Sequence, residues 1–93
     1  MVVAVRTWDL HLNGCASLKD KRRIIKSLKD RLHQRFNVSV AETASHDLWQ
    51  RAELTCCVVA GERRQAERVL ASAERLVAAH QLTRIIDAAT SFV

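Results

Sequence analysis

The 93-residue chain is organised around one stretch, Ser17–Phe36, which reads SLKDKRRIIKSLKDRLHQRF. Its apolar side chains recur at spacings that place them on one stripe of a helix with about 3.6 residues per turn. The stripe consists of Leu18, Ile25, Leu28, Leu32 and Phe36. Ser17 suits the N-cap, and Asp20 follows three residues later, as in a capping box. The pattern predicts a long amphipathic helix over 17–36, with its apolar stripe buried.

A row of basic side chains runs beside this stripe. Residues 17–36 hold eight Lys or Arg and two Asp, a net charge of +6, whereas the whole chain carries +5. The rest of the chain therefore sums to −1, and the basicity of the protein belongs to one element. At helical steps of three or four residues a single basic ridge is formed by Lys19, Arg22, Lys26, Lys29 and His33, flanked by Arg31 and Arg35.

This one-sided charge has two interpretations. One is a solvated face that keeps a small protein soluble, although such faces usually mix both signs. The other is a phosphate-binding surface, because cations clustered on one face are the electrostatic footprint of a nucleic-acid binder. On the second interpretation, phosphates are contacted by Lys19, Arg22, Arg23, Lys26, Lys29 and Arg31.

Composition narrows the class of protein. A hydrophobic content of 48%, two Gly and no Pro fit one domain over 1–93 without long linkers. No apolar run is long enough to span a membrane, and the first residues lack the features of a secretory signal. The three cysteines cannot all pair, which suits a reducing compartment. We therefore expect a cytoplasmic protein without membrane contact, metal or cofactor.

The remaining segments alternate between strands and one more helix. Residues 2–12 predict a strand, in which a bulge near Arg6–Trp8 would bring Val3 and Val5 onto the face of Trp8. After Asn37, which suits a left-handed helix end, residues 38–43 predict a second strand. Residues 44–48 predict a loop, and a third strand opens at Trp49 and ends at Gly61. Residues 62–80 predict a helix and 82–92 a last strand.

The order strand, helix, strand, strand, helix, strand is typical of the split βαβ, ferredoxin-like fold. This α+β class has a four-stranded antiparallel sheet with two helices on one face. The other face would stay open, and small or polar residues are expected there: Ser39, Ala41, Glu53, Thr55 and Cys57. Such a face could serve as a homodimer surface, because small side chains allow close approach.

Few residues outside the basic ridge point to chemistry. The central strands lack the aromatic residues that RNA-recognition domains of this fold use to stack bases. We expect the side chain of Trp49 to be buried as a core anchor. The alternative is that it forms a stacking platform beside the basic helix. Glu42 and Asp47 are the nearest approach to paired carboxylates, and no nucleophile accompanies them. We therefore expect no enzymatic activity and no catalytic residues.

Three motifs resemble a known family. They are SLKDKR at 17–22, RFNVSVAE at 35–42 and DLWQRA at 47–52, and together they resemble the YlxP-like family of small uncharacterised bacterial proteins. The resemblance implies a ferredoxin-like fold and, because its members are often encoded near translation and ribosome-maturation factors, an RNA- or ribosome-associated role. It implies no catalytic residues. This chain departs from the family in its three Cys and in Asp20, where Glu is more usual.

Residues and resemblance together predict a non-enzymatic RNA-binding or ribosome-associated accessory protein that contacts phosphates through its basic helix. The alternative is a protein-interaction module that homodimerises through the open sheet face and binds no nucleic acid.

Overall fold

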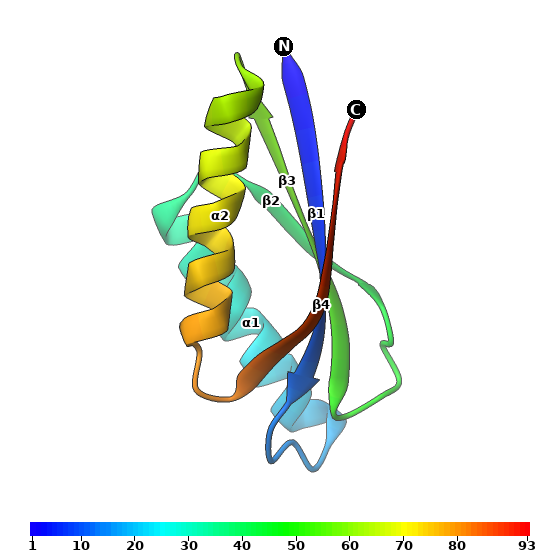
Figure 1. Cartoon of the computed structure of the whole chain (residues 1–93). Helices are drawn as coiled ribbons and strands as arrows, with labels where there is room; N and C mark the ends of the chain where they lie inside the picture. The colour runs from blue at the N-terminus through cyan, green and yellow to red at the C-terminus, as the bar shows by residue number, and fades with distance from the viewer.

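Two helices lie on one face of a four-stranded sheet (Figure 1). A computed structural model describes residues 1–93. Its elements are β1 (Val2–Leu12), α1 (Leu18–Arg35), β2 (Ser39–Ala44), β3 (Arg51–Ala60), α2 (Arg63–Ala79) and β4 (Thr83–Phe92). The strand order is β2-β3-β1-β4, with every neighbouring pair antiparallel. The predicted ferredoxin-like class is therefore confirmed.

β1 occupies the middle of the sheet, and its side chains alternate between the two faces. Its even-numbered residues Ala4, Trp8, Leu10 and Leu12 are buried under the helices. Pairing with β3 runs without interruption from Val2 to His11, so the bulge predicted near Arg6–Trp8 is wrong. Val3 and Val5 lie on the opposite face from Trp8, where branched side chains suit a half-buried pleated surface. The one irregularity of β1 lies in its pairing with β4, between Asp9 and Leu10.

The hydrophobic core lies between the sheet and the helices. α1 contributes Ile24, Ile25, Leu28 and Leu32, and α2 contributes Ala66, Leu70, Ala73 and Val77. Trp8 is fully buried among them, and its indole Nε1–H donates to Glu74 Oε1 on α2 at 3.0 Å. This hydrogen bond satisfies the only polar atom of the indole, which allows so large a side chain to be enclosed.

The ends of α1 differ in part from the sequence prediction. Ser17 is the N-cap, and its Oγ accepts from the Asp20 backbone N–H at 3.1 Å. The Asp20 carboxylate accepts from Ala16 N–H at 3.4 Å, so the return bond of the capping box is displaced by one residue. At the other end Phe36 is an extended C-cap, and Asn37 is not left-handed. The chain passes from the helix straight into the extended backbone of β2, which needs no left-handed residue.

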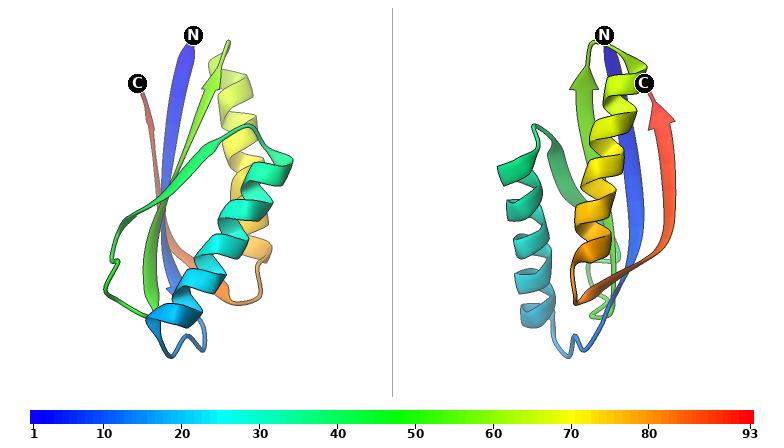
Figure 2. Two further views of the ribbon diagram at one scale, coloured as in Figure 1. Left: turned by 180° about the vertical axis from the view of Figure 1, so that it is seen from behind. Right: turned by 60° about the vertical axis from the view of Figure 1, so that its left-hand side comes forward.

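The second face of the sheet is left uncovered by the helices (Figure 2). Hydroxyl and charged side chains occupy its middle rows, where Thr7 and Thr55 Oγ1 atoms lie 3.1 Å apart. Arg51 Nη2 donates to Asp9 Oδ2 at 2.6 Å across β3 and β1. The residues predicted for this face are half-buried or exposed: Ser39, Ala41, Glu53, Thr55 and Cys57.

Candidate nucleic-acid interface

Most cations of α1 are free of acidic partners. Among the predicted phosphate contacts, Lys29 is half-buried and the others are exposed: Lys19, Arg22, Arg23, Lys26 and Arg31. Of the eight Lys or Arg in 17–36, two form an ion pair within 4.0 Å: Lys21 with Glu42 and Lys26 with Asp30. The other six, which include Arg35, have none. The helix therefore presents a cationic surface that its own chain does not neutralise.

A hollow beside α1 gathers part of the basic ridge. It has a volume of about 390 Å³ and lies between the helix and β2. It is lined by Arg22, Ile25, Lys26, Lys29, Asp30, His33 and Glu42. Of the other predicted contacts, Lys19 continues the row by one helical step, whereas Arg23 and Arg31 do not line it. We call this concavity the basic hollow.

One ion pair partly offsets the charge of the basic hollow. Lys26 Nζ donates to Asp30 Oδ2 at 2.8 Å, one helical turn away. The hydrogen bond raises the pKa of Lys26 and lowers the pKa of Asp30. Both side chains are exposed, so solvent screens the pair and it contributes little to stability. Arg22 and Lys29 remain without a carboxylate partner.

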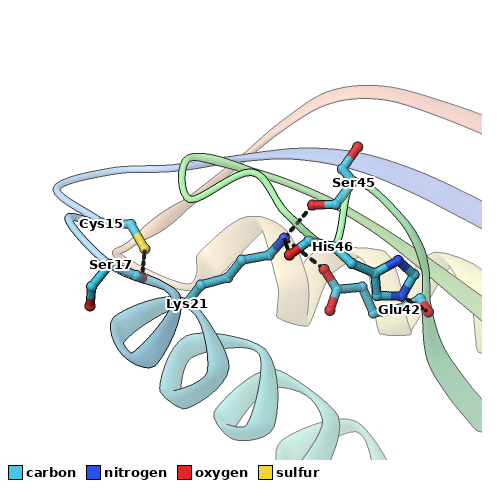
Figure 3. A network of polar contacts seen from close by, with 6 residues as sticks. All are labelled: Cys15, Ser17, Lys21, Glu42, Ser45 and His46. Carbon is cyan, nitrogen blue, oxygen red and sulfur yellow. Dashed lines mark hydrogen bonds and ion pairs between the residues drawn. The ribbon is translucent and has the colours of Figure 1, made fainter.

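Lys21 lies apart from the basic ridge and is 2% exposed. Its side chain extends from the start of α1 to the loop between β2 and β3 (Figure 3). Its Nζ donates to the carbonyl oxygens of Ser45 at 2.5 Å and His46 at 3.4 Å, and it lies 2.8 Å from Glu42 Oε2. Glu42 Oε2 is buried and accepts no directed hydrogen bond, so its contact with the ammonium is one of charge. These groups together compensate a buried cation.

The role of Lys21 is not among the sequence predictions, although the spacing of its neighbours contains a signal for it. Lys21 follows Leu18 by three residues and precedes Ile25 by four, so it falls within the apolar stripe. A cation at such a position needs a partner inside the fold. The sequence places Glu42 near Asp47 as a carboxylate pair, whereas in the structure Glu42 pairs with Lys21.

The loop that Lys21 holds has defined geometry. Ser45 has a left-handed backbone with φ of 63°, and its carbonyl also accepts from Leu48 N–H at 3.1 Å. His46 Nε2 lies 3.1 Å from the backbone oxygen of Glu42. At the far end of the loop, Gln50 O accepts from Leu12 N–H at 2.8 Å. Hydrogen bonds therefore fasten the loop at both ends.

Trp49 projects from this loop and is 52% exposed. The predicted core anchor is wrong, because β3 begins two residues later, at Arg51, and sheet pairing does not direct the indole toward the helices. Leu48 beside it is 53% exposed. The two side chains, with Asp47, Gln50 and Arg51, line a second hollow of about 380 Å³. We call it the Trp49 hollow.

A third hollow, of about 480 Å³, lies on the open sheet face, and its polar lining includes Thr7, Asp9, Arg51, Glu53 and Asp87. No group of three or more His, Cys, Asp or Glu side chains is placed to hold a metal ion. None of the helices combines the length and the apolar character needed to cross a membrane. Cys56 is buried, and this burial raises the pKa of its thiol to about 11.

Fold and charge define a ferredoxin-like α+β protein with a cationic helix. The family model described as "Protein of unknown function (DUF503)" matches residues 3–90, and the chain belongs to this family. It is also 39% identical over 54 residues to the uncharacterised protein YlxP of Bacillus subtilis (strain 168). That match covers 58% of this chain and 59% of the relative, so it spans less than two thirds of either. The YlxP-like resemblance is confirmed.

A solved structure supports the fold. This chain is similar to the solution NMR structure of a de novo designed protein with a ferredoxin fold, with a TM-score of 0.54. The match covers 100% of this chain and 83% of the designed chain. The two sequences are 17% identical, so the likeness concerns the fold alone.

Proposed function

We propose that the protein is a cytoplasmic, non-enzymatic accessory protein that binds RNA, either free or on the ribosome. Support comes from the six Lys or Arg of residues 17–36 that lack an acidic partner within 4.0 Å. Three members of the basic ridge line the basic hollow and form no ion pair: Arg22, Lys29 and His33. A phosphate backbone is the ligand whose charge density suits such a row.

Contacts of this kind position a nucleic acid and carry little sequence information. Four phosphate contacts, from Lys19, Arg22, Lys26 and Lys29, would give a log–log salt dependence with a slope of roughly −3 on single strands. Binding through the ridge should therefore weaken steeply as salt rises and vary little with sequence.

The test compares two variants of equal net charge. One carries Lys19→Gln, Arg22→Gln, Lys26→Gln and Lys29→Gln on α1. The matched control carries Arg64→Gln, Arg68→Gln, Arg75→Gln and Arg84→Gln, all exposed and outside α1. Binding of a short single-stranded RNA of mixed sequence is measured by fluorescence anisotropy, and thermal melts verify folding. We expect the α1 variant to bind at least about tenfold more weakly and the control to bind like wild type.

Two results would contradict the proposal. Equal binding by wild type and the α1 variant would remove the basic ridge as the contact surface. Equal losses in both variants would show that net charge alone attracts the RNA.

A protein-interaction module that homodimerises through the open sheet is the second candidate. The uncovered face and the 65% exposure of Val59 at its end favour it. Light scattering across a range of concentrations would detect a dimer. Partners that survive nuclease treatment in a pull-down would favour this function over RNA binding.

A further inference from the structure

We propose that the Trp49 hollow takes one unpaired base of a single-stranded RNA whose phosphates lie along the basic ridge. This inference rests on the proposed function and names its ligand more closely: a strand with at least one unstacked base, not a duplex.

The chemistry of the hollow suits a nucleobase. The hollow has a volume of about 380 Å³ and is shallow and open to solvent, so it offers a platform and not an enclosed pocket. The indole of Trp49 offers a flat π-face, on which any base can stack. The amide of Gln50 and the carboxylate of Asp47 line the same hollow and provide hydrogen-bonding groups for a base edge. An aromatic face with a few polar groups is how single-stranded RNA is usually held.

The exposure of Trp49 has no structural explanation within the chain. Tryptophan is highly buried on average, and Trp8 of the same chain is fully buried with its N–H satisfied. Trp49 is half-exposed and contributes no hydrogen bond to the fold. Leu48 beside it is equally exposed, so the two side chains form a contiguous apolar surface that another molecule can cover.

The platform is held in place before any ligand arrives. Lys21 fastens Ser45 and His46 to α1, and Gln50 is fastened to Leu12 of β1. These bonds lie on both sides of Trp49 in the sequence. A fixed loop loses little conformational entropy on binding, so stacking on the indole would be favoured.

The loop that carries Trp49 lies against the start of α1, where Lys21 Nζ contacts the carbonyl oxygens of Ser45 and His46. Glu42 lines the basic hollow, and its backbone oxygen contacts His46 of the loop that carries Trp49. Its negative charge is offset by Lys21 and does not repel a phosphate. An RNA strand bound along α1 would therefore approach the indole from the start of the helix, and Asp47 is the one carboxylate that lines the hollow there.

The cationic surroundings also decide between possible occupants. An apolar segment of a protein would contact Leu48 and Trp49 but would make no use of the unpaired charges of Arg22 and Lys29 on α1. A single-stranded nucleic acid uses both features, since its bases stack and its phosphates pair with cations. In a duplex the bases are already stacked on each other, so the indole would add nothing.

The experiment separates the indole from the cations. Trp49→Ala removes the stacking surface, Trp49→Phe retains part of it, and Leu82→Ala is the control for an exposed apolar side chain outside both hollows. The probes are a single-stranded RNA, the same sequence as a duplex, and inorganic polyphosphate. We expect Trp49→Ala to weaken single-strand binding about tenfold. Trp49→Phe should recover most of this loss, and Leu82→Ala should bind like wild type. Duplex and polyphosphate binding should not change.

Tryptophan emission gives an independent readout on the intact protein. Single-stranded RNA should quench the exposed Trp49 of wild type. It should leave the emission of Trp49→Phe unchanged, because only the buried Trp8 remains.

Three other outcomes would contradict the base site, the proposed function or both. If Trp49→Ala binds the single strand like wild type while the α1 variant does not, the base site is wrong and the proposed function stands. If Trp49→Ala weakens duplex and polyphosphate binding equally, the indole supports the loop and takes no base. If neither the α1 variant nor Trp49→Ala changes binding, both proposals fail.

Discussion

His80 ends α2 in a setting that disfavours its protonated form. Burial and the nearby positive charge of Arg31 lower the pKa of its imidazole. The backbone N–H of Leu82 donates to Nδ1 at 3.3 Å, which requires that this nitrogen carry no proton. The folded protein therefore holds this side chain neutral.

The first prediction concerns pH. Because the folded pKa of His80 lies below the unfolded value of about 6.5, unfolding takes up a proton at mildly acidic pH. The contribution of His80 to stability is complete above this value and is lost as the pH falls toward the folded pKa. Urea titrations at about pH 7.5 and 5.5 should show a smaller decline for His80→Asn than for wild type. Equal declines would contradict the shift.

The adjacent cysteines should differ in reactivity. Cys56 is buried on the helix side, and burial, with a smaller effect of Cys57, raises its pKa to about 11. Cys15 is also buried, and Cys57 is half-buried on the open face. Since the thiolate is the reactive form, brief iodoacetamide treatment of native protein near pH 8 should modify Cys57 alone. Peptide mass spectrometry reads the site, and modification of Cys56 at a similar rate would contradict its burial.

At the scale of elements, Lys21 joins α1 to the β2–β3 loop. Removing the ammonium leaves the Glu42 carboxylate without its counter-charge and takes one donor from the carbonyls of Ser45 and His46. We expect Lys21→Met to lower the free energy of unfolding by about 2–4 kcal/mol, with partial solvent access to Glu42 limiting the loss. Lys26→Met breaks an exposed pair and should cost less than about 1 kcal/mol.

A double-mutant cycle isolates the charge contact. After Lys21→Met, Glu42→Gln should cost less than it does in wild type, because the carboxylate has already lost its counter-charge. We expect a coupling of about 1–2 kcal/mol by chemical denaturation. Additive losses would mean that Lys21 acts through the carbonyls of Ser45 and His46 alone.

Elements with strong periodicity were predictable, whereas contacts between elements were not. The alternation of Ala52, Leu54, Cys56 and Val58 identifies β3 and its buried face. In β1 the apolar Val3 and Val5 lie on the open face. The hydrophobic pattern alone therefore predicts a bulge, which the pairing of β1 with β3 does not show. Helical spacing gave the basic ridge. The basic hollow and the burial of Lys21 depend on where β2 and the loop lie against α1, which spacing within one helix does not specify.

At the scale of the whole molecule, β1 should be the most protected strand. It is hydrogen-bonded to β3 on one edge and β4 on the other, and the helices cover one face of the sheet. β2 is an outer strand with a single neighbour. Amide exchange followed by NMR should be slowest in β1 and β3 and faster along β2 and β4. Comparable exchange in β1 and β2 would contradict this ranking.

The central place of β1 also bears on how the chain acquires its fold during synthesis. Both neighbours of β1 are made after it, and the second of them, β4, extends to Phe92. While the chain grows on the ribosome, β1 therefore waits with an apolar face and unpaired edges accessible to other chains. The sheet is complete only after β4 has emerged, so β1, although made first, stays incompletely paired longer than any other strand.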